Sequence, residues 1–375
     1  MTATIELRAI ELREVVLPLV RPFRTSFGEE REKRAILVRA EAADVAGWGE
    51  CVSSESPRYS EEWLAGSWAA IGSFLAPPLL GTPIGDPEDV GRMLAWVRGH
   101  RMAKAALESA VLDAWLRSQG LGMASWLGGV RDRITCGVSV GIAATVEQML
   151  DEIRGYLERG YQRVKLKIEP GRDVEVVSRI RSELPDTPIS VDANGAYSLA
   201  DAPVFDALDE LALTMIEQPL HHEDLVNHAR LQARLRTPIC LDESIRSAAD
   251  ARAAIQLAAC RVINIKPGRV GGPLEAKRVH DVARAAEMPV WIGGMLETGV
   301  GRAQNVALAS LPGVTLPGDT SASDRYFATD LTAPFEVSED GTMAVPGGPG
   351  IGVEPLAEHL EAWTVRAHTI TSGRT

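Results

Sequence analysis

The chain has 375 residues, of which 45% are hydrophobic and 24% are charged, and its formal net charge is −12. This length suits one large domain plus a smaller one, and the composition is that of a soluble globular protein. The acidic balance excludes nucleic acid and anionic membranes as expected partners.

The N-terminal stretch "MTATIELRAIELREVVLPLV" carries Glu or Arg every few residues, so it predicts neither a signal peptide nor a membrane span. No later apolar run approaches the length of about 20 residues that a membrane helix needs. The cysteines Cys51, Cys136, Cys240 and Cys260 are far apart and show no CxxC spacing. This pattern favours reduced core residues over disulfides or a zinc site, and we expect a cytoplasmic protein.

Residues 1–130 combine two strand-like segments with a helical one. The strand-like segments are "IELRAIELREVVLPL" and "REKRAILVRAEAADVAGWGE", and the helical pattern is "AKAALESAVLDAWLRSQ". We interpret this part as a separate α+β domain.

Residues 131–322 alternate short β-branched runs with longer amphipathic segments. The runs are "ITCGVSVGI", "RVKLKI", "PISVDAN", "LTMIEQP", "PICLDES", "RVINIKP" and "PVWIGG". The helical patterns between them include "DVEVVSRIRSEL", "HEDLVNHARLQARL", "SAADARAAIQLAA" and "PLEAKRVHDVARAAE". Such alternation predicts parallel βαβ units with right-handed crossovers.

An ionisable residue ends several of these apolar runs at a constant interval. The steps Lys167 to Asp192, Asp192 to Glu217 and Glu217 to Asp242 are each 25 residues, and Asp242 to Lys266 is 24. A (β/α) barrel keeps such a step, because each unit returns the chain to the rim where catalytic groups collect. An open doubly wound sheet is the alternative, but no GxGxxG or GxxxxGKS turn is present.

Residues 323–375 have no barrel period. They are rich in Pro and Gly, as in "VPGGPGIGVEP". We expect this segment to pack back onto the rest of the protein.

The carboxylates of Asp192, Glu217 and Asp242 lie on successive predicted strand ends and can converge on one point. Three like charges there repel unless they are protonated or neutralised by a cation. Oxygen ligands favour Mg²⁺ or Mn²⁺, and zinc is not expected without His or Cys. The alternative is that each acid caps the following helix or pairs with a surface arginine.

Three lysines surround the same point. Lys165 and Lys167 share one face of their strand, which barrel closure turns inward. Lys266 ends a strand on the opposite side of an eight-stranded barrel. A lysine that acts as a base needs a lowered pKa, which nearby positive charge provides: Lys165 for Lys167, and Arg269 for Lys266. The alternative is a buried ion-pair cluster of lysines and carboxylates, which costs much desolvation for little stability.

These groups suit proton abstraction next to a carboxylate. A divalent cation stabilises the negative charge that develops as an α-proton leaves. Lysines on opposite faces would give 1,1-proton transfer, or racemisation, through an enediolate, whereas one active lysine would support dehydration or cycloisomerisation. We expect His221 and His222 to be loop residues or to contribute to a cap rather than to bind metal.

The motifs "VKLKI", "VDANGAYS", "IEQPL", "CLDESI", "NIKPGRVGG", "GGMLETGVGRAQNVALASLP" and "LPGDTSASDRYFATD" together resemble the enolase superfamily. Within its muconate lactonizing enzyme subgroup, the chain is most similar to the N-acylamino acid racemases and o-succinylbenzoate synthases. The resemblance implies a modified TIM-type barrel, (β/α)7β, with an N-terminal α+β capping domain, and a homo-oligomer.

The resemblance also implies residue roles. Lys167 and Lys266 would be the acid/base catalysts, and Asp192, Glu217 and Asp242 would bind Mg²⁺. The remaining implied positions are Lys165, Asn194 and Glu243 beside these groups, and Ser139, Gly294, Met295, Leu296, Phe23, Phe27 and Tyr59 in the substrate pocket. Phe23 and Phe27 would lie on a mobile N-terminal loop that closes over the acyl side chain.

We therefore expect a racemase of N-acylamino acids, with N-succinylamino acids as substrates and with o-succinylbenzoate synthase activity as well. A dedicated o-succinylbenzoate synthase of menaquinone synthesis is the first alternative. A metal-stabilised barrel that binds a carboxylate without turning it over is the second. Ser54 and Glu55 stand where similar proteins are apolar, which leaves the acyl preference open.

Overall fold

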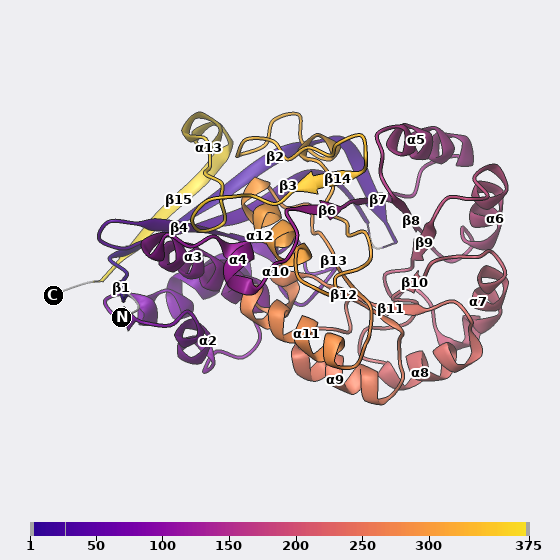
Figure 1. The fold of residues 1–375 in the computed structure, drawn as a ribbon, viewed down its shortest axis with the longest axis horizontal. Coiled ribbons are helices and arrows are strands. Elements are labelled where there is room, and N and C mark those ends of the chain that lie inside the picture. The colour runs from indigo at the N-terminus through magenta and orange to yellow at the C-terminus, as the bar shows by residue number, and fades with distance from the viewer. Residues whose placement is uncertain (1–3, 27, 373–375) are drawn as a thin grey trace.

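The computed structural model describes residues 4–26 and 28–372. It combines a parallel barrel with an antiparallel sheet that covers one side of it (Figure 1). The predicted α/β class, with a TIM-type barrel and an N-terminal α+β cap, is confirmed.

The barrel sheet has seven parallel strands in the order β13-β12-β11-β10-β9-β8-β7. Their bounds are β7 (Gly137–Val140), β8 (Arg163–Lys167), β9 (Ile189–Asp192), β10 (Ile216–Glu217), β11 (Ile239–Leu241), β12 (Val262–Ile265) and β13 (Val290–Ile292). Every residue of these strands is buried. These runs are mostly apolar in sequence because both faces of each strand are buried. Alternate side chains of each strand point into the barrel.

A short segment, residues 314–319, closes the ring between β13 and β7. Val314 bridges Val290 in parallel, and Gly318 bridges Cys136 in parallel. The N–H of Gly137 donates to the carbonyl of Gly318 at 2.7 Å. This segment is the eighth strand of the predicted (β/α)7β arrangement.

The barrel helices form the outer layer seen in Figure 1. They are α5 (Val146–Glu158), α6 (Val174–Glu183), α7 (Ala202–Asp209), α8 (Leu225–Arg234), α9 (Ala248–Gln256), α10 (Pro267–Val270), α11 (Pro273–Ala285) and α12 (Gly299–Ala309), with 3-10 turns at Leu199–Asp201 and Ser323–Arg325. The four helical patterns read from the sequence correspond to α6, α8, α9 and α11. Side-chain caps begin several of them, such as Thr145 before α5 and Ser247 before α9.

The cap is a four-stranded antiparallel sheet in the order β15-β2-β3-β4. Its strands are β2 (Ala9–Thr25), β3 (Gly28–Glu41), β4 (Ala46–Cys51) and β15 (Thr364–Thr371). The smaller elements of this region are β1 (Ile5–Glu6), β5 (Pro83–Ile84), α1 (Leu64–Ala70), α2 (Glu88–Leu94), α4 (Met123–Leu127) and the turns Ile71–Leu75 and Pro77–Leu79. Helix α3 (Arg101–Gln119) packs on β4 so closely that a Cβ at Gly49 would lie 2.0 Å from the carbonyl oxygen of Ala106.

The C-terminal segment contributes to both parts of the protein. Strand β14 (Thr342–Ala344) pairs antiparallel with β6 (Arg133–Thr135), α13 (Ala357–Trp363) follows, and β15 joins the cap sheet beside β2. The limits at residues 130 and 322 stay predictions. The single strand predicted over "ITCGVSVGI" is wrong, because its first half pairs with the C-terminal segment as β6 and only its second half enters the barrel as β7.

Buried Glu108 links α3 to the barrel. Its carboxylate accepts from the N–H of Leu274 at 2.9 Å, and a Cβ at Gly272, whose φ is +132°, would lie 2.2 Å from it. Burial raises the pKa of Glu108 from 4.5 to about 8. Among the described residues, no helix is both long and apolar enough to cross a bilayer.

This carboxyl group makes stability depend on pH. Between pH 4.5 and about 8 the folded state keeps a proton that the unfolded state releases, so stability falls as the pH rises through this window. We expect Glu108→Gln to remove that fall. The free energy of unfolding of the variant, relative to that of wild type, should therefore rise by about 1 kcal/mol or more from pH 5.5 to pH 8.5. Urea unfolding at both pH values measures it, with exposed Glu147→Gln as the control. Equal pH dependence in wild type and Glu108→Gln would contradict it.

Candidate active site

The predicted strand-end residues lie at one rim of the barrel. Lys167 on β8 is level with Asp192 on β9, and Asp192 is level with Glu217 on β10. Asp242 directly follows β11, and Lys266 directly follows β12. All five side chains are buried, with Lys167 the most exposed at 8%. The spacing of 24–25 residues therefore does correspond to neighbouring strand ends.

Lys165 is the centre of a buried cluster of charges. Its Nζ lies 2.6 Å from Asp319, 2.9 Å from Glu217 and 3.2 Å from Asp192. The Nζ of Lys167 lies 2.6 Å from Asp192 and 2.9 Å from Asn194 Oδ1. Both lysines point into the barrel, as predicted.

Asp242 has a second group of cations around it. Lys266 donates to Asp242 Oδ2 at 2.8 Å and to the hydroxyl of Tyr59 at 3.1 Å. Arg269 donates to the other carboxylate oxygen of Asp242 and, at 3.3 Å, to the same hydroxyl. Tyr59 comes from the cap, so a cap residue helps to position a barrel lysine.

Neighbouring groups raise the pKa of two buried lysines, Lys165 and Lys266. Burial alone would lower the pKa of Lys165, but the charges of Asp319, Glu217 and Asp192 outweigh it, and the pKa rises. Burial is likewise outweighed at Lys266, whose pKa is raised beside Tyr59 and Glu243. The lowered pKa expected for Lys266 beside Arg269 is therefore absent from this arrangement. The ion-pair cluster, considered as an alternative, exists here, although all three lysines also line the cavity.

The donor set fits a hard divalent cation in its chemistry. Asp192, Glu217 and Asp242 are fully buried and offer only oxygen atoms. They are not among the groups of the described residues whose ligand atoms all lie within 4.8 Å of one another, and ammonium and guanidinium groups lie beside them. Buried Glu243 Oε2 has no hydrogen-bond partner in the described part of the chain. An unpartnered buried carboxylate oxygen beside these acids is what a cation would compensate.

Side chains beside these acids fix their orientation. Asn194 Nδ2 donates to Glu243 Oε1 at 3.0 Å, while the backbone N–H of Asn194 donates to Asp192 at 3.0 Å. Asn264 donates to Glu217 Oε1 at 2.7 Å. Below this layer Met215, Cys240, Val262 and Trp291 form a separate apolar cluster. One charged group, buried Arg163, lies over the Trp291 ring at 4.6 Å.

Asp319 was not singled out from the sequence, although it lies within the quoted motif "LPGDTSASDRYFATD". It ends the eighth-strand segment, lines the cavity, and holds both Lys165 and Arg163, each at 2.6 Å. Lys165 and Arg163 oppose the burial of this group, and the pKa of Asp319 is lowered to about 2. Asp319 lies on an irregular segment that only isolated bridges join to the sheet. The sequence of this segment therefore showed no strand period that would have indicated Asp319.

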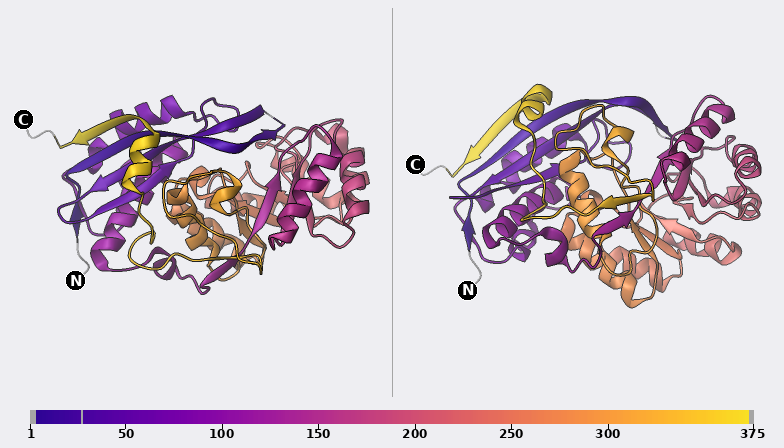
Figure 2. Two further views of the ribbon diagram at one scale, coloured as in Figure 1. Left: turned by 90° about the horizontal axis from the view of Figure 1, so that it is seen from above. Right: turned by 45° about the horizontal axis from the view of Figure 1, so that its top comes forward.

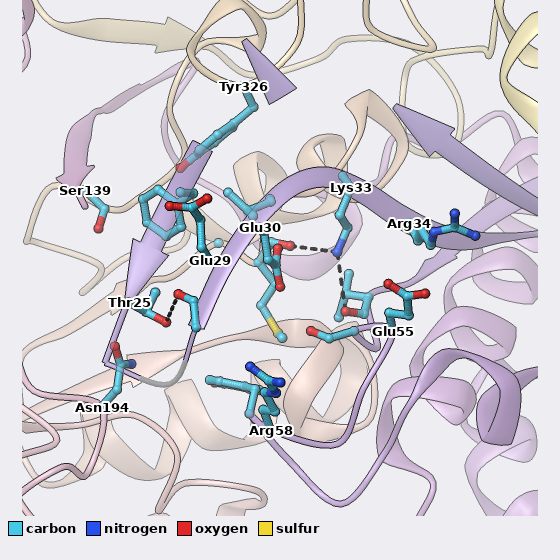
Figure 3. A pocket seen from close by; sticks show the side chains of 18 of the residues that line it. Thr25, Glu29, Glu30, Lys33, Arg34, Glu55, Arg58, Ser139, Asn194 and Tyr326 are labelled. Carbon is cyan, nitrogen blue, oxygen red and sulfur yellow. Dashed lines mark hydrogen bonds between the residues drawn. The ribbon is translucent and has the colours of Figure 1, made fainter. Parts of the chain in front are cut away.

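A cavity of about 340 Å³ lies between the barrel rim and the cap. The residues that line it from the barrel side are Ser139, Asn194, Gly294, Met295 and Leu296, with Lys165, Lys167 and Lys266. Figure 3 shows Ser139 and Asn194 on this wall. The Oγ of Ser139 is buried and has no hydrogen-bond partner among the described residues. The three residues 294–296 lie just after β13 rather than on it.

The hairpin β2–β3 forms the other wall. Figure 2 shows it extending from the cap sheet towards the barrel. Near its end, the carbonyl of Arg24 accepts from the N–H of Ile142 at 3.1 Å, and the Arg24 side chain lies 3.1 Å from Glu169. Phe23 lines the cavity and packs edge-on against Tyr326 at 6.5 Å. The predicted loop around Phe23 is therefore a strand, and Phe27 lies outside the described residues.

Three neighbouring residues, His221, His222 and Glu223, could also bind a metal. Within the described residues, they form the one group whose ligand atoms all lie within 4.8 Å of one another. They follow β10, and His221 and Glu223 are exposed. Exposed groups of this kind often bind no metal, and the roles predicted for these histidines stay untested.

Comparison with known proteins gives matches along nearly the whole chain. Residues 8–128 match the mandelate racemase/muconate lactonizing enzyme N-terminal domain, and residues 148–359 match the enolase C-terminal domain-like family. The chain is 54% identical to an N-succinylamino acid racemase of Amycolatopsis sp, over 96% of this chain and 98% of that one. It is 48% identical to an o-succinylbenzoate synthase of Geobacillus kaustophilus, over 96% of each.

The fold agrees with solved structures. An enolase superfamily member from Listeria innocua has a TM-score of 0.94 at 38% identity, over 98% of this chain and 100% of that one. These similarities extend across both the cap and the barrel. The chain thus belongs to the enolase superfamily, among the mandelate racemase and muconate lactonizing enzymes.

Proposed function

We propose that this enzyme racemises N-acylamino acids, including N-succinylamino acids, by 1,1-proton transfer between Lys167 and Lys266. One observation carries the proposal: these two buried lysines line the same cavity from β8 and from the end of β12, four strands apart in the sheet order. In an eight-stranded barrel that separation puts them on opposite sides. A substrate held between them has one amine facing each side of its α-carbon.

Asp192, Glu217 and Asp242 would hold a divalent cation, Mg²⁺ or Mn²⁺. When bound, this ion would neutralise the substrate carboxylate and favour the charge that appears as the α-proton leaves. Its attraction for the three carboxylates would also replace part of their pairing with the lysines, which favours the neutral amine that a base requires.

The chain's own residues divide the remaining work. Lys167, oriented by Asn194 at 2.9 Å, would take the proton from one face, and Lys266, oriented by Tyr59 at 3.1 Å, would return one to the other. Lys165 would remain charged beside Asp319 and balance the acids. The unpartnered hydroxyl of Ser139 is available to the acyl group.

A dedicated o-succinylbenzoate synthase is the second candidate. It is supported by relatives of that name, including one from Bacillus subtilis that is 45% identical. Dehydration needs one proton-transfer lysine, while the other can hold the intermediate by charge. Turnover of an N-succinylamino acid and of the o-succinylbenzoate precursor, measured on one preparation, separates the racemase, the synthase and an enzyme with both activities.

Arg269 offers a way to separate the two activities. It contacts both Asp242 and Tyr59, the two partners of Lys266. We expect Arg269→Gln to displace Lys266 and to lower racemisation about 10-fold more than dehydration, because only racemisation needs proton transfer by both lysines. Initial rates with both substrates measure this difference. The control is Arg261→Gln, an exposed arginine directly before β12. An equal loss of both activities would contradict it.

Non-catalytic carboxylate binding is the least supported hypothesis, because the relatives of this chain are enzymes. The cytoplasmic location and the homo-oligomeric state stay predictions.

A further inference from the structure

The compounds in the names of the two relatives, a substrate in one case and a product in the other, share one chemical feature. An N-succinylamino acid and o-succinylbenzoate both carry a succinyl chain, which ends in a carboxylate. The proposed function uses the carboxylate next to the reacting carbon. The distal carboxylate, at the other end of the acyl chain, needs a cation of its own if the protein is to recognise it.

Lys33 on β3 has the properties of such a cation. Its side chain lines the cavity and is buried, with 4% exposed. The Nζ atom donates to the backbone carbonyls of Met295 at 3.0 Å and Val52 at 3.4 Å. Among the described residues, no carboxylate oxygen lies within 4.0 Å of it. Figure 3 shows the amine held between these two contacts beside the cavity.

The energetics of burial favour an anionic ligand at this point. An ammonium group taken out of water loses its solvation, which neutral carbonyl groups compensate only in part. Burial raises the pKa of Glu50, and the charge of Lys33 opposes that rise. The Glu50 carboxylate, however, accepts its hydrogen bonds from Thr298 and Gly301. A ligand carboxylate would form the short charge-assisted bond that Lys33 lacks.

The other cations of the cap wall are less suited. Arg31 has 76% of its side chain exposed and lies 2.7 Å from Glu29. Arg34 is paired with Glu32 at 2.8 Å and Glu14 at 3.3 Å. Arg58 is exposed. Charge pairs in contact with water contribute little to binding, because solvent screens them.

We infer that Lys33 binds the distal carboxylate of the acyl chain and makes the enzyme selective for dicarboxylic acyl groups. This inference rests on the proposed function for the reacting end of the substrate. Lys33 also joins cap strand β3 to the barrel segment at Met295, so the acyl chain is bound where the cap meets the barrel.

The test uses two matched ligands that cannot react. N-succinyl-2-methylalanine has no α-proton, and its succinamoyl counterpart replaces the distal carboxylate with a neutral amide of nearly the same shape. Titration calorimetry in the presence of Mg²⁺ should show wild type binding the acid about 10- to 100-fold more tightly than the amide. Lys33→Gln should bind both equally, and Lys33→Arg should still prefer the acid. Surface Lys277→Gln on α11 is the control that should keep the wild-type preference.

Lys33→Gln keeps a donor for the Met295 carbonyl, so a purely structural role would weaken both ligands by the same factor and leave their ratio unchanged. That result, or a wild type without preference for the acid, would overturn the inference. If the glutamine variant does not fold, Lys33→Met is measured in the same way, and the ratio again decides. Absence of α-deuterium exchange with N-succinylalanine in D₂O would refute the racemase proposal alone, because the unreactive ligands report on the acyl site independently.

Discussion

Lys167→Ala and Lys266→Ala are each expected to lower racemisation of N-succinylalanine by about 10³-fold or more, because each removes the amine that serves one face of the α-carbon. Both side chains are buried and line the cavity. Optical rotation against time, started separately from each enantiomer, measures the loss. Half-buried Lys277→Ala, on α11 and outside the cavity, is the matched control and should racemise at the wild-type rate.

The exchange of hydrogen for deuterium separates the two lysines. With one lysine left, the remaining amine should still remove the proton from the enantiomer that faces it, so deuterium from D₂O should enter one enantiomer without racemisation. Proton NMR of each enantiomer measures this in both variants. Lys167→Ala leaves Asp192 beside Lys165 at 3.2 Å, so thermal unfolding should show a folded variant. Wild-type racemisation in either variant would end the two-base assignment.

Glu217→Gln is expected to weaken Mg²⁺ or Mn²⁺ binding by about 100-fold or more and to lower turnover by about 10³-fold. Glu217 is fully buried, 2.9 Å from Lys165 and 2.7 Å from Asn264. The amide keeps the shape of the side chain but removes its charge. Titration calorimetry with the metal alone measures binding, and a chelator added to wild type should reproduce the loss of turnover until metal is restored.

The surface cluster gives this experiment its control. A His221→Ala, His222→Ala double variant removes two of the three groups in the described part of the chain whose ligand atoms lie within 4.8 Å of one another. It should leave metal affinity and turnover at the wild-type level. If this double variant lost the metal while Glu217→Gln kept it, the assignment of Asp192, Glu217 and Asp242 would be wrong.

The repeating part of the fold could be read from the sequence in detail. Lys167, Asp192 and Glu217 recur every 25 residues, and the parallel register does place them at one height. The inward direction of Lys165 and Lys167 followed from their spacing of two residues on a strand that a barrel closes. These features depend on periodicities within short stretches of chain, which is why one sequence was enough.

The contacts between distant segments could not be read in this way. Thr342 pairs with Thr135, and Ile370 with Ile10, across more than half of the chain. No local pattern indicates such partners, and the division of "ITCGVSVGI" into β6 and β7 depends on one of them. The pairing of Lys165 with Asp319 likewise depends on how the eighth-strand segment closes the ring.

The sequence by itself determined the barrel, the strand-end acids and the lysines that face them. Only the tertiary structure decided which other charges lose contact with water. In "REKRAIL", Lys33 and Arg31 share one face of the strand, yet Lys33 is 4% exposed while the Arg31 side chain is 76% exposed. Periodicity is a property of neighbouring residues, whereas the burial of a charge is set by the segments that pack over it, here the backbone at Val52 and Met295.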